Sequence, residues 1–411
     1  MKDKSDKNSK PRMPLEGIKV ISVEQIVTAP FCTMMLADRG AEIIKIENPG
    51  LGDPMREAKA PPPWREEKDG KSMSQEFFQY NRNKKSITLN LKDREAQKIL
   101  KALIRDADVF IENLRPGAVE KWGVSRKDLR EINPRLIHAV ISGFGLTGPY
   151  RNWPAYDPVM QGMGGLADRI GTEDGAPCLV PLAFTDLLTS VPTAYAIAEA
   201  LFTRERTSEG AFIDMSMYDC TIFFNEREMR YYTFNQELQP RGRDIYAPYG
   251  VFRAGDGKYL SFYISMENAW KHACEAIGRE DLIDDPKFNQ ASIRSKNRDS
   301  LIIPILEEWA KDKTAKEVLS IFMDAGAPAG LVQTAEEIYN CEHVKARNML
   351  LEIDDPVYGK KKLPRTPIIT EGYEATPTLP PPQLGEHNEE ILGGLGYTRE
   401  QIDELRAKGA I

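Results

Sequence analysis

Two aspartates lie in sequence settings where a carboxylate could act on a substrate. Asp157 lies in PAYDPVMQGMGG, a turn that leads into glycine-rich chain, and Asp186 lies in PLAFTDLLTS, where an apolar run meets the start of a helix. At a helix N-terminus the local dipole and the backbone N–H groups keep a carboxylate ionised. An ionised aspartate in a water-poor cleft is a competent nucleophile toward a thioester, and nearby N–H groups could stabilise the oxyanion formed on attack.

Both aspartates also have a purely structural interpretation. Aspartate is a preferred helix N-cap because its side-chain oxygen accepts hydrogen bonds from backbone N–H groups, and capping alone would account for Asp186. Asp157 precedes Pro158, a setting typical of turn carboxylates. The local sequence leaves the catalytic and the structural interpretation open for each residue.

Other common catalytic signatures are missing from the sequence. Residues 24–30 follow the first predicted strand and read EQIVTAP, without the glycines of a dinucleotide-binding turn. There is no Walker A sequence, no G-x-S-x-G elbow and no H-E-x-x-H motif. The four histidines are far apart and offer no metal-ligand spacing. Carboxylate chemistry is what remains.

The elements that must position these residues alternate between strand and helix. Strands are predicted at 17–23, 41–47, 86–91, 108–112, 136–142 and 211–217, and helices at 29–39, 93–106 and 118–122. Strand, helix and strand in so short a span close as a right-handed parallel unit. The sequence therefore predicts an α/β fold with a Rossmann-like, open and mostly parallel sheet, which favours ligand binding at the carboxyl ends of its strands.

A long helix rich in small residues is predicted over residues 186–202. Pro192 lies inside it, so the helix either kinks there or begins properly only near Ser190.

A chain of 411 residues is too long for one ordinary core, and its character changes along the sequence. Residues 1–13 are too polar to bury and are expected to form a disordered tail. We expect residues 14–225 to form the N-terminal part of the large α/β domain and residues 226–345 to form a linker and a smaller α+β domain. The loop-rich segment 346–411 would return to the large domain.

Composition and charge restrict the partners and the compartment. The net charge of −7 disfavours nucleic acid and anionic membranes, so neither is expected as a partner. The five cysteines form no C-x-x-C pair, which indicates reduced thiols and predicts a cytoplasmic protein. No apolar segment follows the basic N-terminus, and no stretch is apolar enough to span a bilayer.

Over almost its entire length the sequence resembles the family III, or CaiB/BaiF-type, CoA-transferases. Seven blocks carry the resemblance, in this order: PLEGIKVISVEQIVTAPFCTMMLADRGAEIIKIENPGLGDPMR, NRNKKSITLNLK, DVFIENLRPGAVEKWG, NPRLIHAVISGFGLTGPY, PAYDPVMQGMGGL, APYGVFRAGDGKYLSF and LGEHNEEILGGLGYTREQI. No single block is decisive, and their number and order make the likeness specific.

The resemblance implies a transferase that moves CoA from an acyl-CoA, such as succinyl-CoA, to a free carboxylic acid. Asp186 would be the nucleophile, through an aspartyl anhydride and an aspartyl-CoA thioester, with Asp157 as a possible second acid. The CoA thioester is then a substrate, and neither a permanently bound cofactor nor a metal is implied. The family likeness further implies a homodimer of two interlinked subunits.

The resemblance also assigns the substrate contacts. The residues implied to bind CoA are Gln25, Ile26, Thr28, Leu89, Lys92, Asn113, Arg115 and Lys121. The basic members would supply local positive charge against the negative total, although Lys84, Lys85 and Lys121, taken individually, are each expected on a solvated face. The residues implied to surround the acyl group are Val27, Tyr156 and Arg243, and Arg243 or Arg151 could pair with the second carboxylate of a diacid.

Two alternatives remain open at this point. An α-methylacyl-CoA racemase has the same fold and needs two proton-transfer groups beside the α-carbon. Asp157 could be one of them, although its neighbour is Tyr156 where a racemase is expected to have histidine. The third possibility is a non-catalytic CoA-binding protein, since a fold alone does not prove activity.

Overall fold

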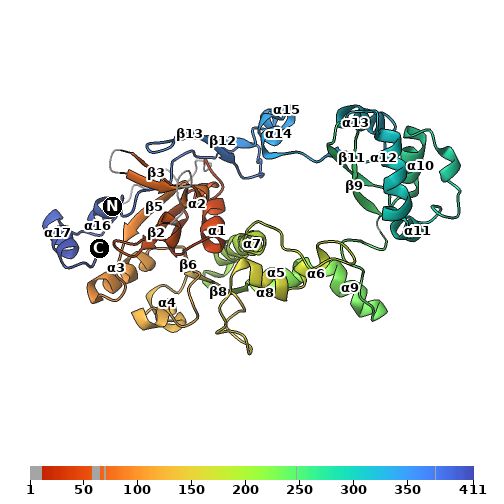
Figure 1. Ribbon diagram of the computed structural model, residues 1–411. Coiled ribbons are helices and arrows are strands. Elements are labelled where there is room, and N and C mark those ends of the chain that lie inside the picture. Colours follow the sequence, from red (N-terminus) through yellow and green to blue (C-terminus); the bar gives the residue numbers. More distant parts are fainter. Residues whose placement is uncertain (1–11, 58–64, 69–70, 247, 375) are drawn as a thin grey trace. The chain divides into compact units, whose positions relative to one another are not determined.

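The computed structural model describes residues 12–57, 65–68, 71–246, 248–374 and 376–411, which divide into two units (Figure 1). Unit 1 comprises the described residues of 1–164, 181–224 and 345–411, and unit 2 comprises 165–180 and the described residues of 225–344. Unit 2 thus includes residues 165–180, which were expected in the large domain. Most of the expected tail at 1–13 lies outside the described residues, and Met13 at its end is buried.

Unit 1 is built on a six-stranded parallel sheet in the order β5-β2-β1-β6-β7-β8. The strands are β1 (Lys19–Val23), β2 (Glu42–Glu47), β5 (Lys84–Thr88), β6 (Val109–Glu112), β7 (Ile137–Ser142) and β8 (Ala211–Ser216). Counted in chain order, they run 3-2-1-4-5-6 across the sheet, which is the Rossmann order. The predicted open parallel sheet is confirmed, and its strand order reverses between β1 and β6.

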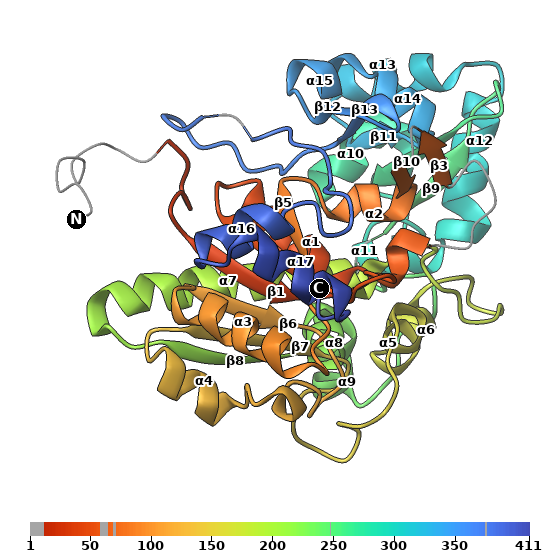
Figure 2. The same cartoon turned by 90° about the vertical axis from the view of Figure 1, so that its left-hand side faces the viewer.

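Helices cover both faces of this sheet, because successive strand residues point to opposite sides. Ile21 packs with α3 (Arg94–Arg105) and with the C-terminal helices α16 (Asn388–Gly394) and α17 (Arg399–Ala407), which Figure 2 shows on one side of the sheet. Val20 packs on the other side with α1 (Thr28–Ala37) and α7 (Phe184–Thr207). The C-terminal segment therefore belongs to the core of unit 1.

The helix that carries Asp186 is longer than predicted. It runs unbroken through Pro192, so the alternative that it begins only near Ser190 is wrong. Proline has no N–H to donate to the carbonyl of Leu188, four residues earlier. Three hydroxyl groups around Pro192 donate to other carbonyls, each four residues before the donor. These donors are Thr189, Ser190 and Thr193. They bond to the carbonyls of Thr185, Asp186 and Thr189, so none of them replaces the donor that is missing at Pro192.

The remaining elements of unit 1 frame the sheet. They are η1 (Pro54–Glu57), β3 (Arg65–Lys68), β4 (Lys71–Ser74), α2 (Gln75–Tyr80), η2 (Val119–Trp122), α4 (Arg126–Ile132), α5 (Asp157–Met163), α8 (Met217–Phe224), β12 (Leu350–Asp355) and β13 (Gly359–Pro364). Helix α4 begins with a capping box between Ser125 and Asp128, which satisfies N–H groups that would otherwise lack partners.

Unit 2 has its own core and is the predicted smaller α+β part. Its antiparallel sheet, in the order β11-β10-β9, consists of β9 (Tyr249–Arg253), β10 (Tyr259–Tyr263) and β11 (Ala329–Leu331). The helices are α6 (Leu166–Arg169), α9 (Glu226–Asn235), α10 (Glu267–Ala276), η3 (Glu280–Leu282), α11 (Ala291–Lys296), the π-helical η4 (Arg298–Ile302), α12 (Ile303–Ala310), α13 (Ala315–Asp324) and α14 (Ala335–Asn340), and α15 (Glu342–Ala346) crosses the boundary to unit 1. Phe252, Trp270 and Phe322 are central in its core.

Among the described helices of both units, none is long and apolar enough to cross a membrane.

Candidate active site

A cavity of about 160 Å³ lies in unit 1 at the carboxyl edge of the parallel sheet. The segments after β1, β6, β7 and β8 line it, and the first turn of α7 adds Asp186. The segments after β1 and β6 are tied together by a reciprocal pair. The Gln25 N–H donates to Asn113 Oδ1 (2.9 Å), and Asn113 Nδ2 donates to the Gln25 carbonyl (2.8 Å). The cavity thus lies where the strand order reverses, the usual ligand position of such sheets.

Asp186 is the third residue of α7, and the N-cap of this helix is Ala183. The interpretation of Asp186 as a helix N-cap is therefore wrong. Its Oδ1 accepts a hydrogen bond from the Thr28 hydroxyl at the start of α1. Burial raises the pKa of Asp186 to about 6, and the charge of Asp157 also raises it, while the hydrogen bond from Thr28 acts in the opposite direction. Asp186 is therefore mostly ionised at neutral pH and more basic than an ordinary aspartate.

Asp157 supplies the cap that Asp186 does not. Its Oδ1 accepts hydrogen bonds from the Thr185 N–H (2.5 Å), the Thr185 hydroxyl (2.6 Å) and the Asp186 N–H (3.4 Å). Its Oδ2 accepts from Gln161 Nε2 (2.6 Å), and the residue is only 8% exposed. The two aspartates therefore act together: Asp157 holds the first turn of α7, and Asp186 in that turn lines the cavity.

The loop after β1 is held in a strained conformation. Ile26 has a φ of 66°, which is unfavourable for a β-branched residue. Its N–H donates to Asp53 Oδ1 (3.1 Å), and Asp53 Oδ2 pairs with Lys45 Nζ (2.7 Å). Both charged side chains of this pair are fully buried. A buried ion pair thus fixes the loop that lines the cavity beside Asp186.

Lys84 belongs to the same buried network, so the expectation that it lies on a solvated face is wrong. Its Nζ lies 2.8 Å from Glu24 Oε1 and also donates to the Pro30 carbonyl and to Asn81 Oδ1. Burial lowers the pKa of Lys84 to about 8. The expectation of a solvated face fits the other two lysines better, because Lys85 is half-exposed and Lys121 is exposed.

A second cavity of about 210 Å³ also adjoins the loop after β1 and shares Gln25 and Leu114 with the first. The residues implied to bind CoA divide between the two. Ile26, Thr28, Asn113 and Arg115 line the first cavity, Leu89 and Lys92 line the second, and Gln25 lines both. Lys121 lines neither, although the adjacent Trp122 lines the second.

The residues implied to surround the acyl group are not all brought together. Tyr156 lines the first cavity with Asp186, whereas Val27 is the buried N-cap of α1 and does not line it. Arg243 lies in unit 2, where its guanidinium is 3.1 Å from Glu173. In the described part of the chain, no three His, Cys, Asp or Glu side chains form a group that could hold a metal ion.

Sequence reasoning missed one wall of the cavity. Trp153 lines it and stacks on Tyr150, with ring centroids 4.1 Å apart. The aromatic spacing in YRNWPAY, directly before Asp157, was a usable signal, because exposed aromatic residues close together often form binding surfaces.

Replacing Lys45 with methionine is expected to lower the free energy of unfolding by about 3–5 kcal/mol, since Asp53 would be left as an unpaired buried charge. Chemical denaturation measures this, and Lys85→Met is the matched control. Lys85 is half-exposed in its pairs with Glu42 and Glu390, so its loss should cost about 1 kcal/mol or less. Equal effects of the two substitutions would contradict a structural role for the buried pair.

The family model and the similar proteins of known name all indicate the same family. Residues 15–388 match the family model described as CoA-transferase family III. A succinyl-CoA–D-citramalate CoA-transferase from Chloroflexus aurantiacus is 31% identical over 98% of this chain and 100% of its own. A succinyl-CoA:glutarate CoA-transferase from Mus musculus is 33% identical over 97% and 90% of the two chains. An acetyl-CoA:oxalate CoA-transferase from Acetobacter aceti is 36% identical over 89% and 91%.

Solved structures agree with the sequence relatives. A CaiB/BaiF family protein from Brucella suis has a TM-score of 0.82 and 32% identity, over 94% of this chain and 100% of its own. The fold and the site thus define a CaiB/BaiF-type α/β enzyme, and the chain belongs to CoA-transferase family III. It transfers CoA between an acyl-CoA thioester and a carboxylic acid. The non-catalytic alternative is not supported.

Proposed function

We propose that this enzyme transfers CoA from a succinyl-CoA-like donor to a free carboxylic acid, with Asp186 as the nucleophile. The observation that carries the proposal is the position of the Asp186 carboxylate in the cavity where the strand order reverses. Asp186 lies in the first turn of α7, and its carboxylate accepts a hydrogen bond from the Thr28 hydroxyl. Its raised pKa leaves it ionised at neutral pH and more basic than an exposed aspartate, which favours nucleophilic attack.

The reaction proceeds by four acyl exchanges. The Asp186 carboxylate attacks the donor's thioester carbonyl, which forms a mixed anhydride and releases the CoA thiolate. The thiolate attacks the aspartyl carbonyl, so that an aspartyl-CoA thioester forms and the donor leaves as a carboxylate. The acceptor carboxylate attacks this thioester, which gives a second anhydride and the thiolate again. The thiolate then attacks the acceptor's carbonyl and frees Asp186.

Each step exchanges one activated acyl group for another, so no ATP is consumed. Water would hydrolyse the anhydride and the thioester, so the site must exclude it. The burial that raises the pKa of Asp186 supports such exclusion. Gln25, Ile26, Thr28, Leu89, Lys92, Asn113 and Arg115 are proposed to hold the CoA portion in the two cavities, with Lys121 at the exposed edge.

The acceptor is proposed to be a dicarboxylic acid. D-citramalate and glutarate, named for two relatives, each carry a second carboxylate, and Arg151 lines the cavity with Asp186. Replacing Arg151 with glutamine should lower kcat/KM for a diacid about 10- to 100-fold, because a charge-assisted hydrogen bond is lost, and should spare a monoacid of equal length. Steady-state assays with both acids measure this, and equal losses would contradict the assignment and leave Arg243 as the candidate.

The test of the proposed function is a search for new CoA thioesters by mass spectrometry. The purified enzyme is mixed with succinyl-CoA or acetyl-CoA and a set of free mono- and dicarboxylic acids, without ATP. A new thioester that the wild type forms and an Asp186→Ala variant does not form supports the proposal. Exchange that continues in the variant would contradict it.

The homodimer remains a proposal that unit 1 supports. Val191, Tyr195 and Phe202 are 53%, 70% and 65% exposed and lie along one face of α7. Such a stripe is typical of an interface, and a second copy of the chain is its proposed occupant. Tyr195→Glu with Phe202→Glu should give a monomer in light scattering, whereas Tyr195→Phe should stay dimeric. A monomeric wild type would contradict this.

Interlinking of the subunits and the cytoplasmic location stay predictions.

A further inference from the structure

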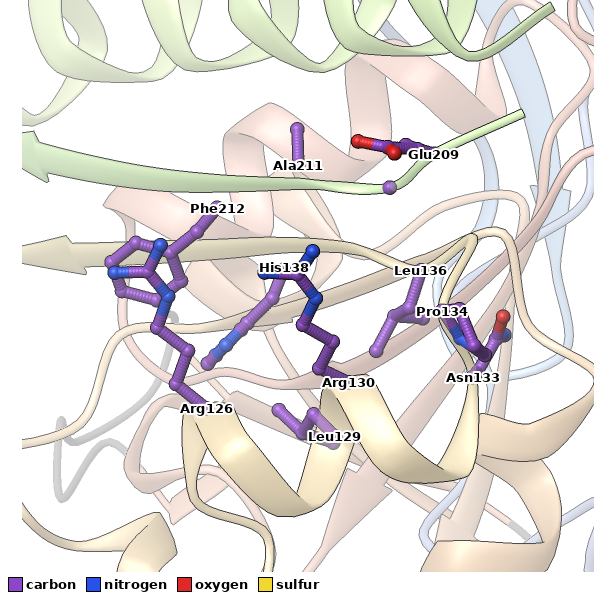
Figure 3. Close-up of a pocket in the computed structure, with 11 residues that line it drawn as sticks. Arg126, Leu129, Arg130, Asn133, Pro134, Leu136, His138, Glu209, Ala211 and Phe212 are labelled. Atoms are coloured by element: carbon purple, nitrogen blue, oxygen red, sulfur yellow. The ribbon is translucent and has the colours of Figure 1, made fainter. Parts of the chain in front are cut away.

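A cavity of about 160 Å³ lies in unit 1 at the amino ends of β7 and β8, between these strands and α4 (Figure 3). His138 and Phe212 are the second residues of the two strands and line it, whereas Ser142 at the other end of β7 lines the active-site cavity. The proposed mechanism therefore uses neither this cavity nor its residues.

The cavity contains two guanidinium groups without acidic partners. Arg126 and Arg130 are one turn apart on α4 and extend toward β8 in Figure 3. The guanidinium of Arg126 lies 4.2 Å from the ring centroid of Phe212. Across the described residues, no carboxylate forms an ion pair with either arginine. Glu209 carries the one carboxylate in the lining, so positive charge exceeds negative.

His138 adds a buried polar group that lacks a partner. It is 6% exposed, and its ring packs between Phe110 (5.3 Å) and Phe212 (5.1 Å). Neither Nδ1 nor Nε2 has a hydrogen-bond partner within the described ranges. An unsatisfied buried donor is costly, so a native imidazole in this position calls for a ligand or a compensating role. Burial, with the charge of Arg126, lowers the pKa of His138 to about 4, so the ring is neutral and offers one N–H.

Asn133 is not available for a ligand. Its Nδ2 donates to the Ile104 and Ala107 carbonyls, and its Oδ1 accepts from the Arg135 N–H. The free donors of the cavity are therefore the two arginines and the imidazole. A phosphoryl group has three or four oxygens that can accept from both guanidinium groups and the third donor at once, whereas a carboxylate has two.

We propose that this cavity is a binding site for a phosphoryl group, held by Arg126 and Arg130 with His138 as a third donor. The ligand is free phosphate or a phosphate monoester. Both arginines are exposed on α4, so a ligand can reach them from solvent, and His138 lines the same cavity.

Calorimetric titration of the full-length enzyme with inorganic phosphate, at constant ionic strength and about pH 8, tests the site. The wild type should bind phosphate, and Arg126→Gln with Arg130→Gln should weaken binding by roughly tenfold or more. Lys127→Gln, which removes a charge from the same helix, should bind like the wild type. No binding by the wild type, unchanged binding by the double variant, or equal weakening by Lys127→Gln would overturn the proposal.

His138→Phe separates a ligand-binding role from a packing role. Phenylalanine keeps the ring between Phe110 and Phe212 and removes the two unpaired nitrogens, so the variant should fold. Its affinity for phosphate should fall several-fold, and an unchanged affinity would remove His138 from the site. Titration with glycerol phosphate distinguishes the two sources. Binding that depends on Arg126 and Arg130 in the same way assigns monoesters, and binding of phosphate alone restricts the ligand to the free ion.

Discussion

Replacement of Asp186 by asparagine is expected to lower kcat for CoA transfer by about 10⁴-fold or more, since no covalent intermediate can form. The shape of the side chain is kept, and its oxygen can still accept the hydrogen bond from Thr28. Steady-state assays with succinyl-CoA and a dicarboxylic acid measure the loss. Asp106→Asn, which changes an exposed aspartate in the same unit, is the control and should keep full activity.

The same variant should be more stable than the wild type above about pH 6. The pKa of Asp186 is about 6 in the folded enzyme and 3.8 in the unfolded chain, so the folded state holds its proton more tightly. The contribution of this group to stability therefore rises as the pH falls from about 6 to about 4. Asparagine mimics the neutral acid and should add up to about 3 kcal/mol at pH 8, with no gain below about pH 4. A variant that is inactive because it is destabilised at pH 8 would contradict this account.

Replacement of Asp157 by alanine should affect both stability and activity. Four hydrogen bonds to its carboxylate would be lost, from the Thr185 N–H, the Thr185 hydroxyl, the Asp186 N–H and Gln161 Nε2, and we expect the free energy of unfolding to fall by about 2–4 kcal/mol. The first turn of α7 would loosen, and kcat should fall about 100-fold because Asp186 is no longer aligned. Denaturation curves and steady-state kinetics measure the two effects.

The matched substitution Asp157→Asn distinguishes a positioning role from proton transfer. Asparagine keeps an acceptor for Thr185 and removes the negative charge that raises the pKa of Asp186. The acid limb of the pH–kcat profile should therefore move to lower pH while most activity is kept. The contrary result would be that Asp157→Asn is as damaging as Asp157→Ala and that the wild type exchanges the α-proton of a branched acyl-CoA with deuterium from solvent. The racemase assignment would then replace the CoA-transferase assignment.

Patterns of a few residues were enough to predict the framework of the fold. The β-branched runs around Ile21 and Phe110 and the helical spacing of Ile99 and Leu103 gave the parallel sheet and its covering helix, because each signal is contained in one element. Strand β5 begins two residues earlier than predicted, because Lys84 and Lys85 are not among the residue types typical of strands. The burial of Lys84 depends on Glu24 and Asn81, which belong to other elements.

The candidate site could be predicted only in part, because its contacts also join residues of different elements. Local sequence suggested Asp157 and Asp186 as separate acids, but the contact that joins them links residues 29 apart, and periodicity carries no information about it. The family resemblance grouped Ile26, Thr28 and Arg115, which do line one cavity. No sequence signal indicated the strained φ of Ile26 or the buried pair of Asp53 that stabilises it.

The most direct test of the central claim is a chemical trap for the aspartyl-CoA thioester. The enzyme is incubated with succinyl-CoA, treated with hydroxylamine and digested, and the peptides are analysed by mass spectrometry. We predict a hydroxamate at Asp186 that depends on succinyl-CoA and is absent from Asp157. An enzyme that transfers CoA but carries the label on another residue, or on none, would contradict the assignment of Asp186 as the nucleophile.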